Sequence, residues 1–359
     1  MRIVELKDLT PGMVVARKVM SETGLVLLES GGRLTPSQIA NLENWGVFRL
    51  YIAEKGEHRA VEAGGSSLRK TEFLTEYVET IGIIIKTFQQ IRCFEELPVM
   101  QMRELVEQKI VLLSETIGAF DYLFEIRLHS EYTFQHSLNV AIIAGILGKW
   151  HNYKGAELKN LILAGLLHDV GKAVIPLEVL DKPDKLSDGE FNVIKGHALA
   201  GYQLVEETAM LDSSVKLAIL QHHERIDGSG YPSGLENEEI HDYAKLIAVA
   251  DIYDAITTDR PYRPRLTPLD AMEAIAAQMY DKLETPICLT FLDKMRDHFS
   301  GNSVLLSNGQ HAKIVVLNTG ERFWTKPIVS VTGGELIDLE KEEKLSIVEL
   351  IVGSEAGCG

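Results

Sequence analysis

The stretch Leu163-Ala-Gly-Leu-Leu-His-Asp-Val-Gly-Lys172 is an apolar run that ends abruptly in His168, Asp169 and Lys172. An imidazole next to a carboxylate can bind one metal ion with it, and the second oxygen of the carboxylate can reach another ion. This stretch therefore predicts a site for two metal ions, which other parts of the chain would have to complete.

The other candidate ligands lie in neighbouring apolar segments. A single histidine is more often a helix cap or a satisfied polar group at the edge of a core. Five of the eleven histidines, however, lie within or at the ends of apolar helices in one region, and burying so many titratable groups is costly unless they share a ligand. The residues of this pattern are His136, His168, His197, His222, His223, Asp169 and Asp251.

A division between two ions follows from these residue types. We expect one ion to be held by His136, His168, Asp169 and Asp251, and the other by Asp169, His197, His222 and His223. Mixed imidazole and carboxylate ligation suits iron, manganese, zinc or nickel. Two ions about 3.5–4 Å apart can share a water, lower its pKa and aim the hydroxide at phosphorus. Lys172, Arg260 and Arg263 would pair with phosphate oxygens.

Composition limits the classes of function. The net charge of −16 argues against binding to a DNA or RNA polymer, because a surface that follows phosphates needs clustered Lys and Arg. Cys93, Cys288 and Cys358 have neither the spacing of a zinc site nor the density of a disulfide scaffold. The charged start of the chain does not resemble a signal peptide, and no apolar run approaches the ~20 residues that span a bilayer. We expect a cytoplasmic protein without a membrane anchor.

A chain of 359 residues exceeds what one core usually holds, so we expect a main domain with smaller modules. Residues 1–53 are predicted to form a small regulatory α/β module, with strand-like stretches at 13–20 and 25–28 and a short helix within 35–46. A signalling partner could act through it. Residues 54–67 are rich in charge, Gly and Ser, which is typical of a linker.

Residues 68–126 have helical periodicity, and Pro98 separates two helices. One face carries an apolar stripe, which is more typical of a core or a homodimer seam than of a cofactor site. The stripe consists of Met102, Leu105, Val106, Ile110, Leu113, Ile117 and Phe120. We therefore expect these residues to form a helical connector.

Residues 127–300 continue as apolar helices that carry the candidate ligands and form the expected catalytic domain. His136 is expected to open one of these helices, and Gly171 to supply the stop after another. Ser187 and Glu190 form a capping box for a helix that should carry His197.

Residues 301–359 change to the periodicity of strands. The turn Ser307-Asn-Gly-Gln310 predicts a hairpin, since Asn-Gly favours the tight turn that matches strand twist. Further strands are expected at 327–331 and 346–352. The fold class is therefore predicted to be mainly α, with the small α/β module at one end of the chain and a small β cap at the other.

Three motifs together resemble the HD-GYP family. They are His168-Asp169 with Gly171-Lys172, the run His222-His-Glu-Arg-Ile-Asp-Gly-Ser-Gly-Tyr-Pro232, and the run Asp251-Ile-Tyr-Asp-Ala-Ile-Thr-Thr-Asp-Arg-Pro-Tyr262. The resemblance covers about residues 115–352 and implies a helical domain of the HD superfamily. The first ~53 residues are similar to a small module often found ahead of such domains.

The resemblance implies metal-dependent hydrolysis of the bacterial second messenger cyclic di-GMP to linear pGpG and, in some members, to GMP. It implies the same metal ligands, with iron or manganese as the expected ions. Lys172, Arg260 and Arg263 match positions that contact substrate phosphate. Asp169 and Lys172 are the expected catalytic residues, and Tyr231 belongs to a triplet that shapes its loop beside the substrate.

Two other functions stay open. One is a sensor that binds cyclic di-GMP but hydrolyses it too slowly to matter. The other is a phosphohydrolase for other nucleotides, including a mixed guanine-adenine cyclic dinucleotide. The sequence leaves open the metal, the preferred cyclic dinucleotide, the final product, the oligomeric state and the signal that the first module receives.

We expect two ions and not three. Some relatives carry a glutamate four residues before the first histidine, where it can reach a third ion, but Tyr132 occupies that position here. A neutral phenol is a poor ligand near pH 7, because its pKa is roughly 10. Glu131 is five residues from His136 and is rotated off the face that a four-residue spacing would share.

Overall fold

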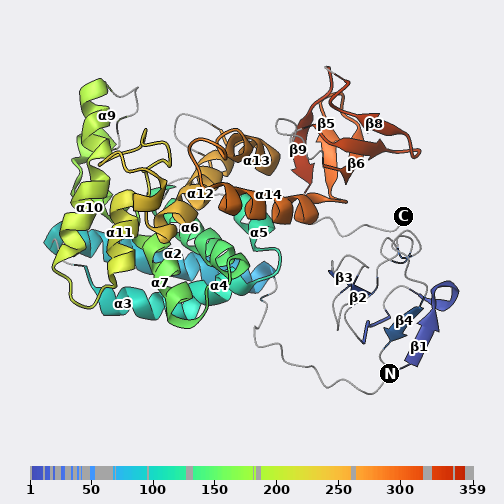
Figure 1. Cartoon of the computed structure of the whole chain (residues 1–359), viewed down its shortest axis with the longest axis horizontal. Coiled ribbons are helices and arrows are strands. Elements are labelled where there is room, and N and C mark those ends of the chain that lie inside the picture. The colour runs from blue at the N-terminus through green and yellow to red at the C-terminus, as the bar shows by residue number, and fades with distance from the viewer. Residues whose placement is uncertain are drawn as a thin grey trace. The chain divides into compact units, whose positions relative to one another are not determined.

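The computed structural model divides the chain into two compact units, Met1–Gly65 and Ser66–Gly359, and each is described by itself (Figure 1). The described residues are 2–10, 13–16, 19–20, 26–28, 34, 39, 42, 49–52, 68, 70–94, 97–126, 132–180, 182, 187–259, 264–317, 326–342 and 344–351. The predicted linker at 54–67 lies outside these residues.

The first unit contains two short antiparallel strand pairs. β1 (Arg2–Glu5) pairs with β4 (Arg49–Ile52), and β2 (Val19–Met20) pairs with β3 (Val26–Leu28). Its own core consists of Val4, Leu9, Val15, Leu34, Leu42, Leu50 and Ile52. The predicted strands overlap β2 and β3, whereas β1 and β4 were not predicted. The short helix expected within 35–46 lies outside the described residues, apart from two helical positions.

The second unit is mainly helical, which confirms the predicted class. Its helices are α2 (Lys70–Phe94), α3 (Val99–Leu105), the π-helical turn η2 (Val106–Ile110), α4 (Val111–Glu115), α5 (Ala119–Glu125), α6 (Tyr132–Trp150), α7 (Gly155–Leu167), the 3-10 turn η3 (Val170–Val174), α8 (Leu177–Leu180), α9 (Asp188–Lys195), α10 (His197–Glu206), α11 (Ser213–Gln221), the 3-10 turn η4 (Asn237–Glu239), α12 (Asp242–Thr257), α13 (Pro268–Ala276) and α14 (Thr285–Phe299).

Helix α6 lies in the middle of the helical core. Residues 135–148 of this helix are buried without a break, so it has no solvent-facing stripe. It packs against α7 and α12, and the three helices carry His136, the His168-Asp169 pair and Asp251 to one place. The buried apolar helices predicted from the sequence therefore also position the candidate ligands.

The apolar stripe of the connector packs into this same core. Six of its seven residues are buried, while Ile117 is 80% exposed. The exception has a local cause, since α4 ends at Glu115 and Gly118 adopts the left-handed region with φ 82° before α5 begins. The stripe therefore belongs to the core of the second unit, which was one of the two expectations, the other being a homodimer seam.

Three local expectations in the catalytic region were wrong. Helix α6 begins at Tyr132, so His136 lies one turn inside this helix and does not open it. The capping box of Ser187 and Glu190 begins α9 as predicted, but α9 ends at Lys195 and His197 begins α10. Gly171 is not a left-handed stop, because it lies inside η3. A Cβ atom there would lie 2.0 Å from the carbonyl oxygen of His197, so this glycine lets η3 pack against α10.

The unit ends in a five-stranded antiparallel sheet that follows α14 (Figure 1). Its strands are β5 (Ser303–Leu306), β6 (His311–Val316), β7 (Ile328–Val331), β8 (Leu336–Asp338) and β9 (Ile347–Ile351), in the order β8-β7-β6-β5-β9. Gly309 has φ 83° in the predicted Asn-Gly turn between β5 and β6. The β cap is thus confirmed, and β8 was not predicted. None of the described helices has the length and apolar character needed to cross a membrane.

Candidate metal centre

The structure brings all the predicted metal ligands together at one buried place. Their ligand atoms form two groups, in each of which the atoms lie within 4.8 Å of one another. One group is His136, His168 and Asp251, and the other is Asp169, His197, His222 and His223. These are the sets predicted for the two ions, with Asp169 as the residue expected to join them.

Three of the histidines stand at helix ends and are held in the same way. Each ring faces a backbone carbonyl three residues upstream, in the last turn of the preceding helix, where carbonyl groups lack helical partners. The pairs are His168 Nδ1 with Gly165 O at 2.8 Å, His197 Nδ1 with Ile194 O at 2.6 Å, and His222 Nδ1 with Ile219 O at 2.8 Å. Since a carbonyl can only accept, Nδ1 carries the proton, and in the neutral ring Nε2 is left with a lone pair.

His136 obtains the same orientation from a carboxylate. Its Nδ1 lies 2.7 Å from Asp254 Oδ2, and its Nε2 faces Asp251 and Asp169. Asp254 is itself fixed, because Asn139 Nδ2 and Thr258 Oγ1 donate to its Oδ1 at 2.6 and 2.8 Å. The sequence analysis gave Asp254 no role, although its place three residues after Asp251 on one helix put both carboxylates on the same face.

The two oxygens of Asp169 face different histidines. Oδ2 lies 3.3 Å from His168 Nε2 and 3.6 Å from His136 Nε2. Oδ1 lies 3.1 Å from His197 Nε2 and 3.9 Å from His222 Nε2. A carboxylate with this geometry can contribute one oxygen to each of two cations.

These contacts fit metal ions better than they fit hydrogen bonds. The Nε2 atoms of His197 and His222 are 3.1 Å apart, and in the neutral tautomers neither has a proton to donate to the other. His168 Nε2 and Asp169 Oδ1 have no hydrogen-bond partner among the described residues, although both are buried. Lone pairs that face one another in a buried site are stabilised by a shared cation, so the donor set fits divalent ions.

The charges of the site differ between its two sides. Burial lowers the pKa of His222 well below its usual range and that of His223 to about 3, so both rings stay neutral and ready to ligate. Burial also disfavours a charged His136, but Asp251 and Asp254 outweigh it and raise the pKa of His136 to about 9. The pKa of Asp169 lies well below its usual range, because Lys172 and nearby imidazoles outweigh its burial.

Of the three residues predicted to bind phosphate, Lys172 lies within the described part of the chain. Its Nζ lies 2.5 Å from Asp169 Oδ2, and its backbone carbonyl accepts a hydrogen bond from Arg92 at 3.2 Å. The ammonium group therefore neutralises the carboxylate at the place where cations are expected. Arg260 and Arg263 lie outside the described residues.

The Gly-Tyr-Pro loop packs directly on a candidate ligand, His223. The Tyr231 ring stacks on His223, with 4.7 Å between ring centroids. Glu224 accepts hydrogen bonds from the backbone of Ser233 at 2.7 Å and Leu235 at 3.1 Å, and the sequence analysis missed this carboxylate. A Cβ atom on Gly230 would lie 2.4 Å from the backbone nitrogen of residue 225, so only glycine fits there. These contacts give the triplet a loop-shaping role.

Tyr132 occupies the position where some relatives carry a glutamate that can reach a third ion. Tyr132 is one turn before His136 on α6, and the two rings are stacked with centroids 6.1 Å apart. Glu131 lies outside the described residues.

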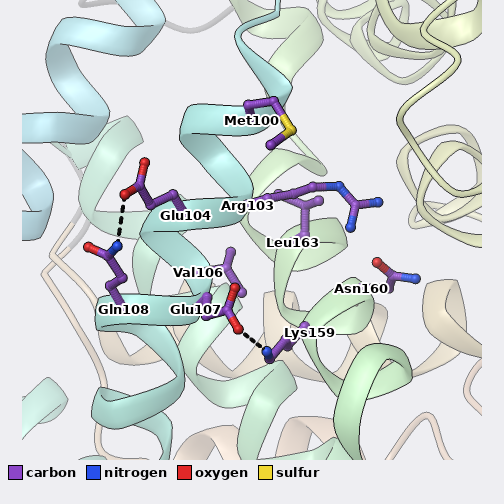
Figure 2. A pocket seen from close by; sticks show the side chains of 9 residues that line it. All are labelled: Met100, Arg103, Glu104, Val106, Glu107, Gln108, Lys159, Asn160 and Leu163. Carbon is purple, nitrogen blue, oxygen red and sulfur yellow. Dashed lines mark hydrogen bonds and ion pairs between the residues drawn. The ribbon is translucent and has the colours of Figure 1, made fainter.

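A pocket of about 430 Å³ lies between the α3–η2 segment and α7 (Figure 2). Its lining residues are Met100, Arg103, Glu104, Val106, Glu107, Gln108, Lys159, Asn160 and Leu163. Figure 2 shows that Glu107 and Lys159, two of the lining residues, form an ion pair with each other. None of the lining residues is a candidate metal ligand. The chemistry of this protein is therefore assigned to the buried histidine cluster and not to this pocket.

Comparison with known proteins agrees with this geometry. Residues 124–284 match the family model described as HD domain. A cyclic di-GMP phosphodiesterase of Pseudomonas aeruginosa is 33% identical over 193 residues, which cover 54% of this chain and 47% of that protein. The 3'3'-cGAMP-specific phosphodiesterase 1 of Vibrio cholerae is 31% identical over 266 residues, which cover 73% of this chain and 54% of that protein. The chain thus spans about half the length of these curated relatives.

A solved structure extends the similarity of the fold. It is described as an HDG"Y"P protein from Bdellovibrio bacteriovorus and is 16% identical to this chain. The two align with a TM-score of 0.53 over 82% of this chain and 99% of the other. The arrangement of helices described above is therefore shared with a known fold.

Proposed function

Since residues 124–284 match the family model described as HD domain, we propose that this chain is a metal-dependent phosphodiesterase that hydrolyses cyclic di-GMP. The observation that carries the proposal is the convergence of two sets of imidazoles on the two oxygens of Asp169. The choice of cyclic di-GMP comes from the similar Pseudomonas protein and from the Gly-Tyr-Pro motif.

The proposed centre holds two divalent ions, with iron or manganese as the expected metals. His136, His168 and Asp251 would hold one, His197, His222 and His223 the other, and Asp169 would serve both. When bound, such ions supply a hydroxide nucleophile near neutral pH and stabilise charge on phosphate oxygens. The protein contributes Nε2 atoms in fixed positions, since hydrogen bonds at Nδ1 orient four of the rings.

Lys172 is proposed to bind a non-bridging oxygen of the scissile phosphate. Its side chain is partly exposed while Asp169 beside it is buried, so the ammonium can turn from the carboxylate to an incoming phosphate. Arg260 and Arg263 are proposed to bind phosphate oxygens as well. These contacts would offset the charge that develops as the bond to the leaving oxygen breaks.

Tyr231 is proposed to form the wall of the substrate site beside the second ion. Burial raises the pKa of its hydroxyl above the usual range, so the side chain stays neutral. The ammonium of Lys195 lies 5.4 Å above the same ring and 4.9 Å above that of Phe191. This arrangement offers aromatic and cationic groups to a dinucleotide that carries both bases and phosphates.

A second candidate substrate is a mixed guanine-adenine cyclic dinucleotide. This candidate is supported by the similarity to the Vibrio enzyme, which aligns with more of this chain than the Pseudomonas enzyme does. Both substrates present the same cyclic phosphate backbone, so the proposed metal chemistry would be shared. The difference would lie in contacts to the bases.

One experiment separates these alternatives. Protein loaded anaerobically with iron or manganese is incubated with cyclic di-GMP, with the mixed dinucleotide and with ordinary nucleotides, and products are separated by chromatography. We expect pGpG or GMP from cyclic di-GMP. Tight binding without turnover would instead indicate a sensor, and turnover of ordinary nucleotides alone would contradict the proposal.

Lys172→Ala provides the matched variant in the same assay. The charge addresses phosphate and not the ions, so we expect near-normal metal content. A charge-assisted contact contributes on the order of 1.5–3 kcal/mol, which corresponds to a rate loss of roughly ten- to hundredfold. Arg260→Ala should behave alike, and unchanged rates in both variants would remove these residues from the site.

A further inference from the structure

A chain of buried hydrogen bonds runs from the connector helix α2 to the metal centre. Tyr77 Oη on α2 donates to Asn139 Oδ1 on α6 at 2.6 Å. Asn139 Nδ2 donates to Asp254 Oδ1 on α12 at 2.6 Å, and Asp254 Oδ2 accepts from His136 Nδ1 at 2.7 Å. All four residues are buried, with at most 2% of each residue exposed.

We propose that Tyr77 and Asn139 are positioning residues of the metal centre, which make its first ion depend on the placement of α2. The first ion is the one assigned to His136, His168 and Asp251, so this inference rests on the proposed function. Neither residue touches an ion or the substrate. They act by fixing Asp254, which in turn fixes the tautomer and the angle of the His136 ring.

The order of donors and acceptors in this series of hydrogen bonds suits the positioning role. Tyr77 donates to Asn139 and Asn139 donates to Asp254, so both donors point toward the centre. The Asp254 carboxylate accepts from Asn139 on one side and from His136 on the other. Burial raises the pKa of Tyr77 well above its usual range, so the hydroxyl remains a donor. Without it, the buried Asn139 carbonyl would lose its partner and the amide could rotate away from Asp254.

Helix α2 is held in register close to this contact. Lys109 on η2 bonds to Glu76 at 2.8 Å and to Glu79 at 3.0 Å, on either side of Tyr77 in the sequence. Nearer its other end, α2 reaches the centre again through the bond from Arg92 to the carbonyl of Lys172. The helix that begins the second unit therefore touches supports of both a metal ligand and the proposed phosphate-binding lysine.

The test compares two variants that each remove one buried phenolic hydroxyl. Tyr77→Phe keeps the ring and breaks the chain at its start. Tyr253→Phe is the matched control, since the Tyr253 hydroxyl is buried and has no hydrogen-bond partner among the described residues. Thr258→Val is a third variant, because it removes the other donor to Asp254 Oδ1 with little change in shape.

The full chain is titrated with manganese, and binding of each ion is measured by calorimetry with elemental analysis. We expect Tyr77→Phe to weaken one of the two ions by roughly ten- to hundredfold and to leave the other unchanged. Thr258→Val should weaken the same ion, and Tyr253→Phe neither. In activity assays at limiting manganese, kcat should fall in the first two variants while KM for cyclic di-GMP stays within twofold.

Thermal unfolding with and without manganese separates positioning from a purely structural role. A structural defect would lower Tm equally in both conditions, whereas the inference predicts that the metal-dependent increase in Tm shrinks in Tyr77→Phe. If the wild-type chain binds two ions and Tyr77→Phe binds both equally well, this inference is overturned but the proposed function is not. A wild-type chain that binds no divalent ion would overturn the proposed function as well.

Discussion

At the scale of single residues, the proposed chemistry depends on Asp169. Its oxygens lie 3.3 Å from His168 Nε2 on one side and 3.1 Å from His197 Nε2 on the other. Asp251 also faces one ring of each group, but its contact with the second group is longer, since its Oδ2 lies 4.0 Å from His223 Nδ1.

We expect Asp169→Ala to lose both ions and all hydrolysis, because one carboxylate serves both positions. Elemental analysis and the cyclic di-GMP assay check this outcome. His151→Ala is the better histidine control. His241 is a poorer control, because it caps α12 by accepting a hydrogen bond from Tyr243 N at 3.1 Å, so its loss would cost helix stability. Full metal content in Asp169→Ala would contradict the shared ligand.

The two ions should differ in their dependence on pH. Without metal the pKa of His136 is raised to about 9, so below that pH its ring must release a proton before it can ligate. Affinity for the ion at His136 should therefore rise about tenfold per pH unit up to pH 9. The pKa of His223 is lowered to about 3, so its ion needs no such release near neutral pH. Manganese titrations between pH 6.5 and 8.5 should give one steep and one nearly flat dependence.

The raised pKa of His136 also determines whether the metal-free protein gains or loses stability as pH rises. A charged His136 beside Asp251 and Asp254 contributes stability that is present below the unfolded pKa of about 6.5 and is lost as pH rises to about 9. Metal-free protein should thus become less stable over this interval. Two equally flat metal titrations would show that His136 is already neutral.

The sequence predicted the ligands but not the residues that support them. Each ligand interrupts an apolar segment, and three of them belong to long motifs, so their pattern is visible without a fold. Asp254 and Glu224 look like ordinary polar residues in a helix and a turn. Their roles depend on hydrogen bonds to His136 and to the loop backbone, which only the packed structure specifies.

At the scale of elements, helix ends place most of the site. Helices α7 and α11 end one residue before His168 and His222, and α10 begins at His197. The start of α9 at its capping box was predicted correctly. The break before His197 was not, because Gly196 has an ordinary helical conformation and gives no signal of a new helix.

Gly230→Ala should disrupt the loop that carries Tyr231. An added Cβ would lie 2.5 Å from Glu224 Cα, and backbone cannot yield as a flexible side chain can. We expect a loss of metal at the His223 side and a fall in Tm. Gly189→Ala in α9 is the control, since a Cβ there meets nothing within 4 Å and alanine favours a helix by roughly 0.5–1 kcal/mol. Equal Tm values for both variants would refute a loop-shaping glycine.

At the scale of the whole molecule, the match of residues 124–284 to the family model described as HD domain agrees with the predicted resemblance, and the mainly helical class is confirmed. The two compact units have separate cores. The precise domain limits, a homodimer and a signalling partner for the first unit stay predictions. They depend on surfaces and partners that a single chain does not specify.

Deleting residues 1–67 should leave a folded, metal-binding second unit. The cut keeps Leu68, which packs against the helical core, and removes none of the proposed ligands. Circular dichroism and elemental analysis of the truncated protein would show native helix content and the full complement of ions. An insoluble product without metal would mean that the first unit is needed for folding.

The central claim is that two ions share Asp169, and anomalous diffraction from crystals loaded with excess manganese tests it most directly. We predict two anomalous peaks per chain, one beside His136, His168 and Asp251, the other beside His197, His222 and His223, with Asp169 between them. A single peak, or three fully occupied peaks with Glu131 bound to one of them, would contradict this account.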